Sequence, residues 1–306
     1  MKHFLTWIAA LALVTSCTGA GSYDRSSWMR ELPDDTPACM MSIPGAHDAC
    51  TAGVDEEYAF FRTQVLDIRG LWEAGVRSFD VRPTSRGDHL GVFHQIADTH
   101  VTFESVIGTL ASCLEENPSE FAVVIFRHED DADLSDNFAS LMGDCLKFVK
   151  SGGLAADFRD DITLGELRGH ILFLSRTRYE DGPVGAYLEG WPDRCEIVNA
   201  QGARTPMTVQ DYYDPQGKED KLAEISATYE RCAGSRIWTV NHCSAYVASG
   251  YGENSENVNA AAADMIRSGH GKTGIMVMDF AGTDVFGGWN VAGGRLVDAI
   301  IENNWK

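Results

Sequence analysis

Three short segments carry residue types that can perform acid–base chemistry. They are Gly45-Ala46-His47-Asp48, Phe79-Asp80-Val81-Arg82 and Phe93-His94, and each follows or closes an apolar run. Near pH 7 one imidazole can be neutral and a second charged, so two histidines can serve as general base and general acid. An arginine binds phosphate oxygens, and a carboxylate orients an imidazole. No cluster with metal-ligand spacing accompanies the segments, so they predict phosphoryl transfer without a metal or other cofactor.

The elements that would position these residues form a strand–helix alternation. Amphipathic helices are expected between several of the strands, which is typical of a (β/α)₈ TIM barrel in a single domain. An open, doubly wound sheet is the alternative. The expected strands are Met40–Ile43, Val76–Val81, Leu90–Phe93, Phe121–Phe126, Ile171–Leu174, Met207–Val209, Ile237–Val240 and Gly274–Met278. The expected helices are Phe61–Ala74, Phe103–Glu116, Ala132–Lys150, Lys218–Cys232, Glu256–Ser268 and Gly294–Asn303.

Two tracts depart from the alternation, because no amphipathic helix is evident between Val81 and Leu90 or between Leu174 and Met207. The barrel is therefore expected to be irregular there. Pro44-Gly45 is interpreted as a turn that ends the first strand. Polar residues close most of the strands, and in a barrel these ends share the face that holds the active site. They are His47, Arg82, His94, Arg127, Arg176, Asp211, Asn241 and Asp279.

From about Trp28 to the C-terminus the chain resembles bacterial phosphatidylinositol-specific phospholipase C. In that family a histidine after the first strand, an arginine after the second and a histidine after the third surround the phosphate. The resemblance implies that His47 is the base that removes the proton of the inositol 2-hydroxyl. It also implies that Asp279 orients His47, although Asp279 could instead cap a helix.

The same resemblance implies that His94 protonates the leaving glycerol oxygen, with Asp48 as its partner and Asp80 in support of that pair. Arg82 matches the arginine that binds the phosphate where eukaryotic enzymes hold calcium. An inositol-binding group is also implied, with looser matches: Arg127, Arg176 (or Arg178), Asp211 and Tyr213. His128 and Glu129 are interpreted as solvated loop.

The implied activity is cleavage of phosphatidylinositol to diacylglycerol and inositol 1,2-cyclic phosphate. One alternative is a glycerophosphodiester phosphodiesterase, but such an enzyme would show a His-Arg start and a Glu-x-Asp metal pair. This chain has His47-Asp48 and Asp80-Val81-Arg82 instead. The other alternative is a surface lipoprotein that binds inositol phosphate or glycan without turnover.

The N-terminus predicts export. Lys2 and His3 precede an apolar run, 4–14, that is too short to span a bilayer and suits a signal peptide. Val14-Thr15-Ser16-Cys17 resembles a bacterial lipobox, which implies a signal peptide over 1–16, a lipidated Cys17 with a short tether over 17–27, and a catalytic barrel over 28–306. An ordinary secretory signal is the alternative.

The charge and composition of the chain limit the classes of partner that it can bind. The formal charge of −20 argues against nucleic acid, whose phosphates require basic surfaces. A monomer that acts at the membrane is expected. Tyr58, Phe60, Phe61, Tyr246 and Tyr251 are candidates for contact with lipid, although Phe60 and Phe61 could equally be helix core. Seven cysteines follow Cys17, so buried thiols or one or two disulfides are expected.

Overall fold

The computed structural model describes residues 23–201 and 205–306. Cys17 and the predicted signal peptide lie outside the described residues. Within the described part, no helix is long and apolar enough to cross a membrane.

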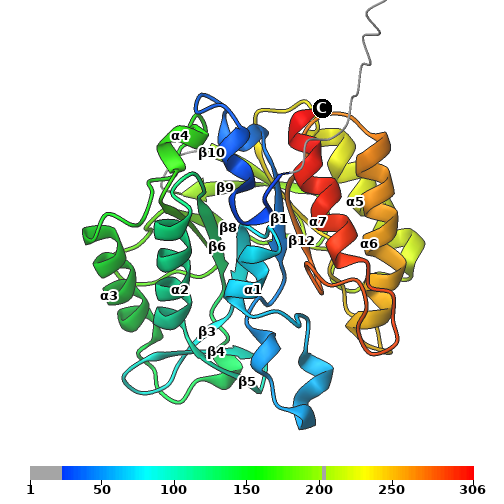
Figure 1. Ribbon diagram of the computed structural model, residues 1–306. Coiled ribbons are helices and arrows are strands. Elements are labelled where there is room, and N and C mark those ends of the chain that lie inside the picture. The colour runs from blue at the N-terminus through cyan, green and yellow to red at the C-terminus, as the bar shows by residue number, and fades with distance from the viewer. Residues whose placement is uncertain (1–22, 202–204) are drawn as a thin grey trace, which may run out of the picture.

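The centre of the molecule is a closed barrel of nine strands (Figure 1). Around the barrel the order is β1-β12-β11-β10-β9-β8-β7-β6-β2, and β1 pairs with β2 to close it. The predicted α/β barrel is therefore confirmed, and the open sheet is wrong. The strands are β1 (Ser42–Ala46), β2 (Ser78–Val81), β6 (Ala122–Phe126), β7 (Ile171–Ser175), β8 (Ala186–Glu189), β9 (Glu196–Gln201), β10 (Thr205–Gln210), β11 (Trp238–His242) and β12 (Gly274–Met278).

The barrel departs from regular alternation at the two places where no helix was expected. Between Leu174 and Met207 the chain forms β8 and β9, and β9 runs antiparallel to both of its neighbours. After β2 it forms a separate antiparallel sheet of β3 (Pro83–Ser85), β4 (Leu90–His94) and β5 (Ala97–Thr102). The expectation that Leu90–Phe93 is a barrel strand is thus wrong, because an apolar run does not reveal which strand it will pair with.

Helices cover the outside of the barrel (Figure 1). They are α1 (Ile68–Glu73), α2 (Phe103–Glu116), α3 (Phe138–Ser151), α4 (Leu164–Leu167), α5 (Lys218–Cys232), α6 (Tyr251–Ser268) and α7 (Gly293–Glu302). The 3₁₀ helices are η1 (Arg25–Glu31), η2 (Ala38–Met40), η3 (Thr51–Gly53), η4 (Glu56–Phe61), η5 (Asp130–Ala132) and η6 (Asn303–Trp305). The helix expected over Phe61–Ala74 is limited to α1, whose first turn is capped by Asp67.

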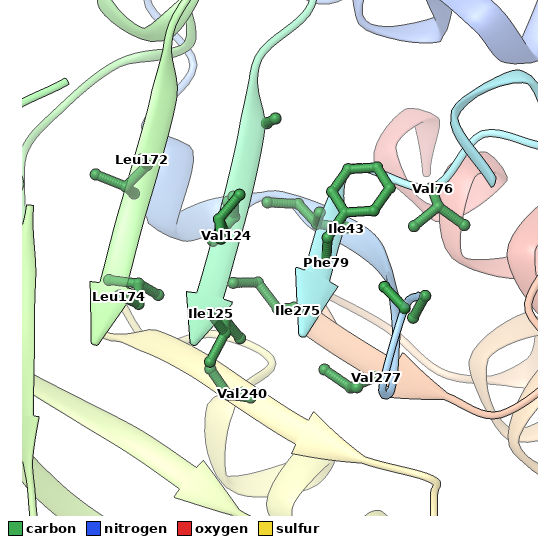
Figure 2. Packing of buried hydrophobic residues seen from close by; sticks show 14 of the residues in the cluster. Ile43, Val76, Phe79, Val124, Ile125, Leu172, Leu174, Val240, Ile275 and Val277 are labelled. Atoms are coloured by element: carbon green, nitrogen blue, oxygen red, sulfur yellow. The ribbon is translucent and has the colours of Figure 1, made fainter. Parts of the chain in front are cut away.

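The parallel strands β1, β2, β6, β7, β11 and β12 are buried along their whole length because helices cover one face and the barrel interior fills the other. Figure 2 shows side chains from neighbouring strands, among them Ile43, Phe79, Val124 and Ile275, packed against one another. Pro44 and Gly45 lie inside β1, so the turn expected there is wrong. A Cβ at Gly45 would approach the Met276 carbonyl oxygen to 3.2 Å, so glycine permits close strand packing.

The seven described cysteines are all free thiols, and five of them are buried: Cys39, Cys50, Cys113, Cys232 and Cys243. Of the two alternatives, the described residues therefore show thiols rather than disulfides.

Candidate active site

A pocket of about 290 Å³ opens at the carboxyl ends of the barrel strands. The backbone pairing of neighbouring strands continues one residue beyond the strand ends. His47 N donates to Met278 O, Arg127 N donates to Val81 O, and Arg176 N donates to Phe126 O. The residues that follow the strands therefore stand side by side. The pocket is lined by His47, Asp48, Arg82, His94, Gln95, Arg127, Glu129, Arg176, Trp191, Asp193, Asp211 and Tyr213.

His47 and Asp279 are neighbours because they follow β1 and β12 at the same level, one residue beyond the paired Ala46 and Met278. The His47 ring is buried, and its Nδ1 lies 2.7 Å from Asp279 Oδ1. Burial alone lowers the pKa of His47, but the carboxylates of Asp48 and Asp279 outweigh it and raise the pKa to about 9. Burial also raises the pKa of Asp279.

Asp48 lies between the two histidines. Its Oδ2 is 3.2 Å from His47 Nε2 and 3.4 Å from His94 Nε2, while its Oδ1 is 3.1 Å from Arg82 Nε. The backbone of Asp48 has φ of 41°, a left-handed conformation that is uncommon for residues other than glycine. Burial raises the pKa of Asp48, yet Arg82, His94 and His47 together hold it below its usual value. Asp48 thus contacts three groups, not only the His94 predicted as its partner.

Arg82 follows β2 and is almost fully buried. Its Nη2 is 3.0 Å from Asp80 Oδ2 and 3.4 Å from His47 Nε2. Asp80 therefore holds the guanidinium, whereas the sequence predicted that it would support His94 and Asp48. Burial opposes ionisation of Asp80, but Arg82 keeps the pKa of that carboxyl far below its usual range.

His94 reaches the pocket from β4, outside the barrel. Its Nδ1 lies 2.7 Å from the carbonyl oxygen of Phe61. Because a carbonyl can only accept, Nδ1 carries a hydrogen, and Nε2 is the atom that faces the pocket. The Tyr251 hydroxyl, at the start of α6, lies 3.4 Å from this Nε2. Tyr251 was considered for contact with lipid, but its side chain is buried beside both histidines.

The opposite side of the pocket holds Arg176, Trp191 and Asp211. The Arg176 guanidinium lies 4.0 Å from the Trp191 ring centroid, and Trp191 Nε1 donates to Asp211 Oδ2 at 2.8 Å. Burial lowers the pKa of Arg176 to about 10. Tyr213 also lines the pocket, with its hydroxyl 3.3 Å from that of Tyr251. Arg178 points away over the Tyr187 ring, so it does not replace Arg176.

Glu129 was interpreted as solvated loop, which is wrong. It is buried in the pocket wall, where its Oε2 is 2.7 Å from Arg127 Nη2 and 3.7 Å from Arg82 Nη1. Its Oε1 accepts from the Gln95 backbone N–H at 3.2 Å. The signal in the sequence was its position just after β6, shared with Arg127.

Sequence reasoning also missed Trp191 and His242. His242 ends β11, with its Nδ1 3.0 Å from Ser244 Oγ and 3.4 Å from Asp211 Oδ1. Burial lowers the pKa of His242 to about 4, so it is neutral at pH 7. The neighbouring Asn241, chosen at the sequence level as the strand-end polar residue, instead donates to the Ile225 carbonyl oxygen under α5.

Among the described residues one group, His47, Asp48 and Asp80, has ligand atoms close enough together to hold a metal ion. The sequence predicted no such cluster. Both carboxylates already contact the Arg82 guanidinium, at 3.1 Å and 3.0 Å. A cation is therefore built into this position of the protein.

The arrangement combines a histidine held by a carboxylate, a second histidine with a fixed tautomer, and a guanidinium between them. Such a set can remove one proton, supply another and bind an anion.

The chain is 24% identical over 282 residues to the 1-phosphatidylinositol phosphodiesterase of Listeria monocytogenes, which covers 85% of this chain and 82% of that protein. A solved phosphatidylinositol-specific phospholipase C from Staphylococcus aureus superimposes with a TM-score of 0.79 at 18% identity, covering 90% and 97% of the two chains. This chain has the fold of those enzymes. The resemblance predicted from the three segments is thereby confirmed.

The solved phosphatidylinositol-specific phospholipase C of Listeria monocytogenes gives a TM-score of 0.71 at 22% identity and covers 92% of this chain and 99% of that one. No protein-family model matches the chain. Both solved structures are covered almost end to end, so the likeness in fold extends over the whole barrel.

Proposed function

We propose that this protein is a phosphatidylinositol-specific phospholipase C that releases diacylglycerol and inositol 1,2-cyclic phosphate. The observation that carries the proposal is the placement of His47 and His94 on either side of Asp48 with Arg82 beside them. The two ring centroids are 6.4 Å apart, so both imidazoles can reach oxygens of one phosphodiester. The similar proteins from Listeria and Staphylococcus, which are named for this activity, support it.

His47 is the general base. Its neutral Nε2 takes the proton of the inositol 2-hydroxyl while that oxygen forms a bond to phosphorus. Asp279, 2.7 Å from Nδ1, stabilises the imidazolium that results. Asp48 Oδ2 lies 3.2 Å from Nε2, so the hydroxyl must replace that carboxylate contact when it gives up its proton. The attack is intramolecular, which removes the entropy cost of bringing the reactants together.

His94 is the general acid. As the bond between phosphorus and the glycerol oxygen breaks, Nε2 of charged His94 gives its proton to that oxygen. The carbonyl of Phe61 holds the other nitrogen, and Asp48 stabilises the charged ring before the transfer. The proton gained by His47 and the proton lost by His94 balance over the reaction.

Arg82 binds the non-bridging phosphate oxygens and stabilises the charge that develops on them. Asp48 and Asp80 fix its orientation through separate contacts to Nε and Nη2. Because the guanidinium supplies the positive charge, we expect turnover without calcium.

Arg127, Arg176, Asp211 and Tyr213 form the inositol site in this proposal, and Trp191 joins them. Charged and hydroxyl groups on this side of the pocket suit a polyhydroxylated ring. Choline and ethanolamine headgroups lack the hydroxyl that must attack phosphorus, so their lipids should not be cleaved.

We further propose export and lipidation at Cys17, on the basis of the lipobox-like segment that precedes it. The protein would then act as a monomer at membranes, with Phe60 and Tyr246 exposed near the pocket end to contact lipid.

The proposal is tested by incubating the purified protein with phosphatidylinositol vesicles in EDTA and following phosphorus resonances. A cyclic phosphodiester is expected to appear before any monoester. Absence of the cyclic product would refute the proposed chemistry, and activity that EDTA abolishes would favour a metal-dependent phosphodiesterase.

A further inference from the structure

The first described residues are fixed at the end of the barrel opposite the pocket. The Tyr23 ring stacks on Trp305 with 5.5 Å between centroids, and its hydroxyl donates to Asp298 at 2.9 Å. Arg25 forms an ion pair with the same carboxylate. The part of the predicted tether from Tyr23 onward is therefore part of the fold.

A buried ion pair holds the following segment in place. Arg77 and Glu120, both fully buried, precede β2 and β6 and lie 3.0 Å apart. Arg77 also donates to the Ser26 carbonyl oxygen at 2.7 Å, and the Met29 N–H donates to Glu120 at 3.1 Å. Displacing η1 would break hydrogen bonds to both charges, which is strongly destabilising. The N-terminal segment is thus attached firmly to the amino ends of the strands.

Helix α6 runs from the pocket to this opposite end, so its length gives the distance between the two ends. It begins at Tyr251, beside His94, and near its other end Ile266 accepts a hydrogen bond from Lys306. Its 18 residues span about 27 Å at 1.5 Å per residue. Figure 1 shows the same separation, with β3–β5 at the bottom and the C-terminus at the top.

A lipid on Cys17 would be joined to Tyr23 by six residue steps. Even fully extended, these steps reach at most about 22 Å. This reach is shorter than the span of about 27 Å along helix α6. It also starts from the end of the barrel opposite the pocket. A bilayer that holds the lipid therefore cannot also meet the pocket end.

The pocket end has its own apolar side chains. Phe60 is 49% exposed and Ile96 is 62% exposed, and they flank Phe61 and Gln95, which contact His94 and line the pocket respectively. Exposed apolar side chains at this end suit contact with a lipid surface. Because the anchor lies at the other end, that surface belongs to another membrane.

We propose that the lipid-anchored protein cleaves phosphatidylinositol in a bilayer other than the one that holds its anchor. The inference rests on the proposed function. Its physical basis is that the tether holds the pocket away from the anchoring surface, so the effective concentration of the pocket at that surface is near zero.

The test uses the mature chain, lipidated at Cys17 and reconstituted in vesicles of phosphatidylcholine with isotopically labelled phosphatidylinositol. An excess of separate vesicles carries the same lipid with a second label. We expect inositol phosphate to form from the separate vesicles, while the lipid of the anchoring vesicles stays intact. Equal cleavage per lipid in both populations would overturn the proposal, as would a Cys17 that carries no acyl groups by mass spectrometry.

A flexible Gly/Ser insert of about 30 residues between Gly21 and Ser22, with a span of roughly 30 Å, should allow the pocket to reach the anchoring bilayer. Cleavage of the anchoring vesicles should then rise by about 100-fold. The same insert placed after Lys306 is the matched control and should change nothing. The unanchored chain, without residues 1–17, should cleave both populations. If even the unanchored chain releases no product, the proposed function fails rather than the orientation.

Discussion

The contact between His47 and Asp279 offers a direct test of the base. Asp279→Asn removes the carboxylate 2.7 Å from His47 Nδ1 while preserving the size of the side chain. The amide can also donate to Nδ1, which would place the ring proton on Nε2, the nitrogen that must be free to accept. We therefore expect both the pKa of His47 and the rate to fall.

The magnitude follows from the site. The pKa of His47 rises from 6.5 to about 9, a preference for the imidazolium worth about 3 kcal/mol at 1.36 kcal/mol per unit. Loss of one charge at hydrogen-bond distance typically changes a pKa by about 1–3 units, so the His47 midpoint should fall to roughly 7. Loss of orientation and of the correct tautomer should reduce kcat/KM by about 10²–10⁴-fold.

Nuclear magnetic resonance titration of the histidine ring protons measures the midpoint, with His47→Ala used to assign the signal. Because a neutral His47 is required, the fraction of the natural protein with His47 able to act as base should increase with pH up to about 9, and this dependence should move to lower pH in Asp279→Asn. Asp298→Asn, at the far end of the barrel, should leave both unchanged. A His47 midpoint near 6.5 in the natural protein, or the same midpoint in Asp279→Asn, would refute the reasoning.

Three further variants separate the remaining roles. Arg82→Lys keeps a positive charge but loses the bidentate geometry of the guanidinium, so kcat/KM should fall roughly 10²–10³-fold in EDTA. Near-normal turnover of this variant would show that Arg82 does not bind the phosphate. His94→Ala should lose about 10²–10⁴-fold with phosphatidylinositol but recover much of the rate on an inositol nitrophenyl phosphodiester, whose leaving group needs no proton, whereas His47→Ala should not recover. Equal defects on both substrates would mean that the roles are misassigned. Tyr251→Phe removes a hydroxyl 3.4 Å from His94 Nε2 and should reduce kcat about 3- to 10-fold on the lipid only, with an unchanged melting temperature; a loss of equal size with the nitrophenyl substrate would argue against an action through His94.

The site residues differ in how far the sequence could predict them. His47, Arg82, Arg176 and Asp279 directly follow barrel strands, and the strand pattern places all of them at one edge. For His94 the sequence predicted the right residue on the wrong element. Its strand was taken as part of the barrel, whereas it pairs in a separate sheet and reaches the pocket from the side.

The sequence by itself determined the α/β barrel, the strand-end positions of the polar residues and the two irregular tracts. These depend on periodicity and on residue type, which are local properties. Only the tertiary structure decided that Asp48 contacts three groups, that Asp80 holds Arg82, and that Glu129 is buried. Contacts of this kind depend on how loops fold back over the strand ends, and side chains distant in sequence meet there only after the barrel has closed.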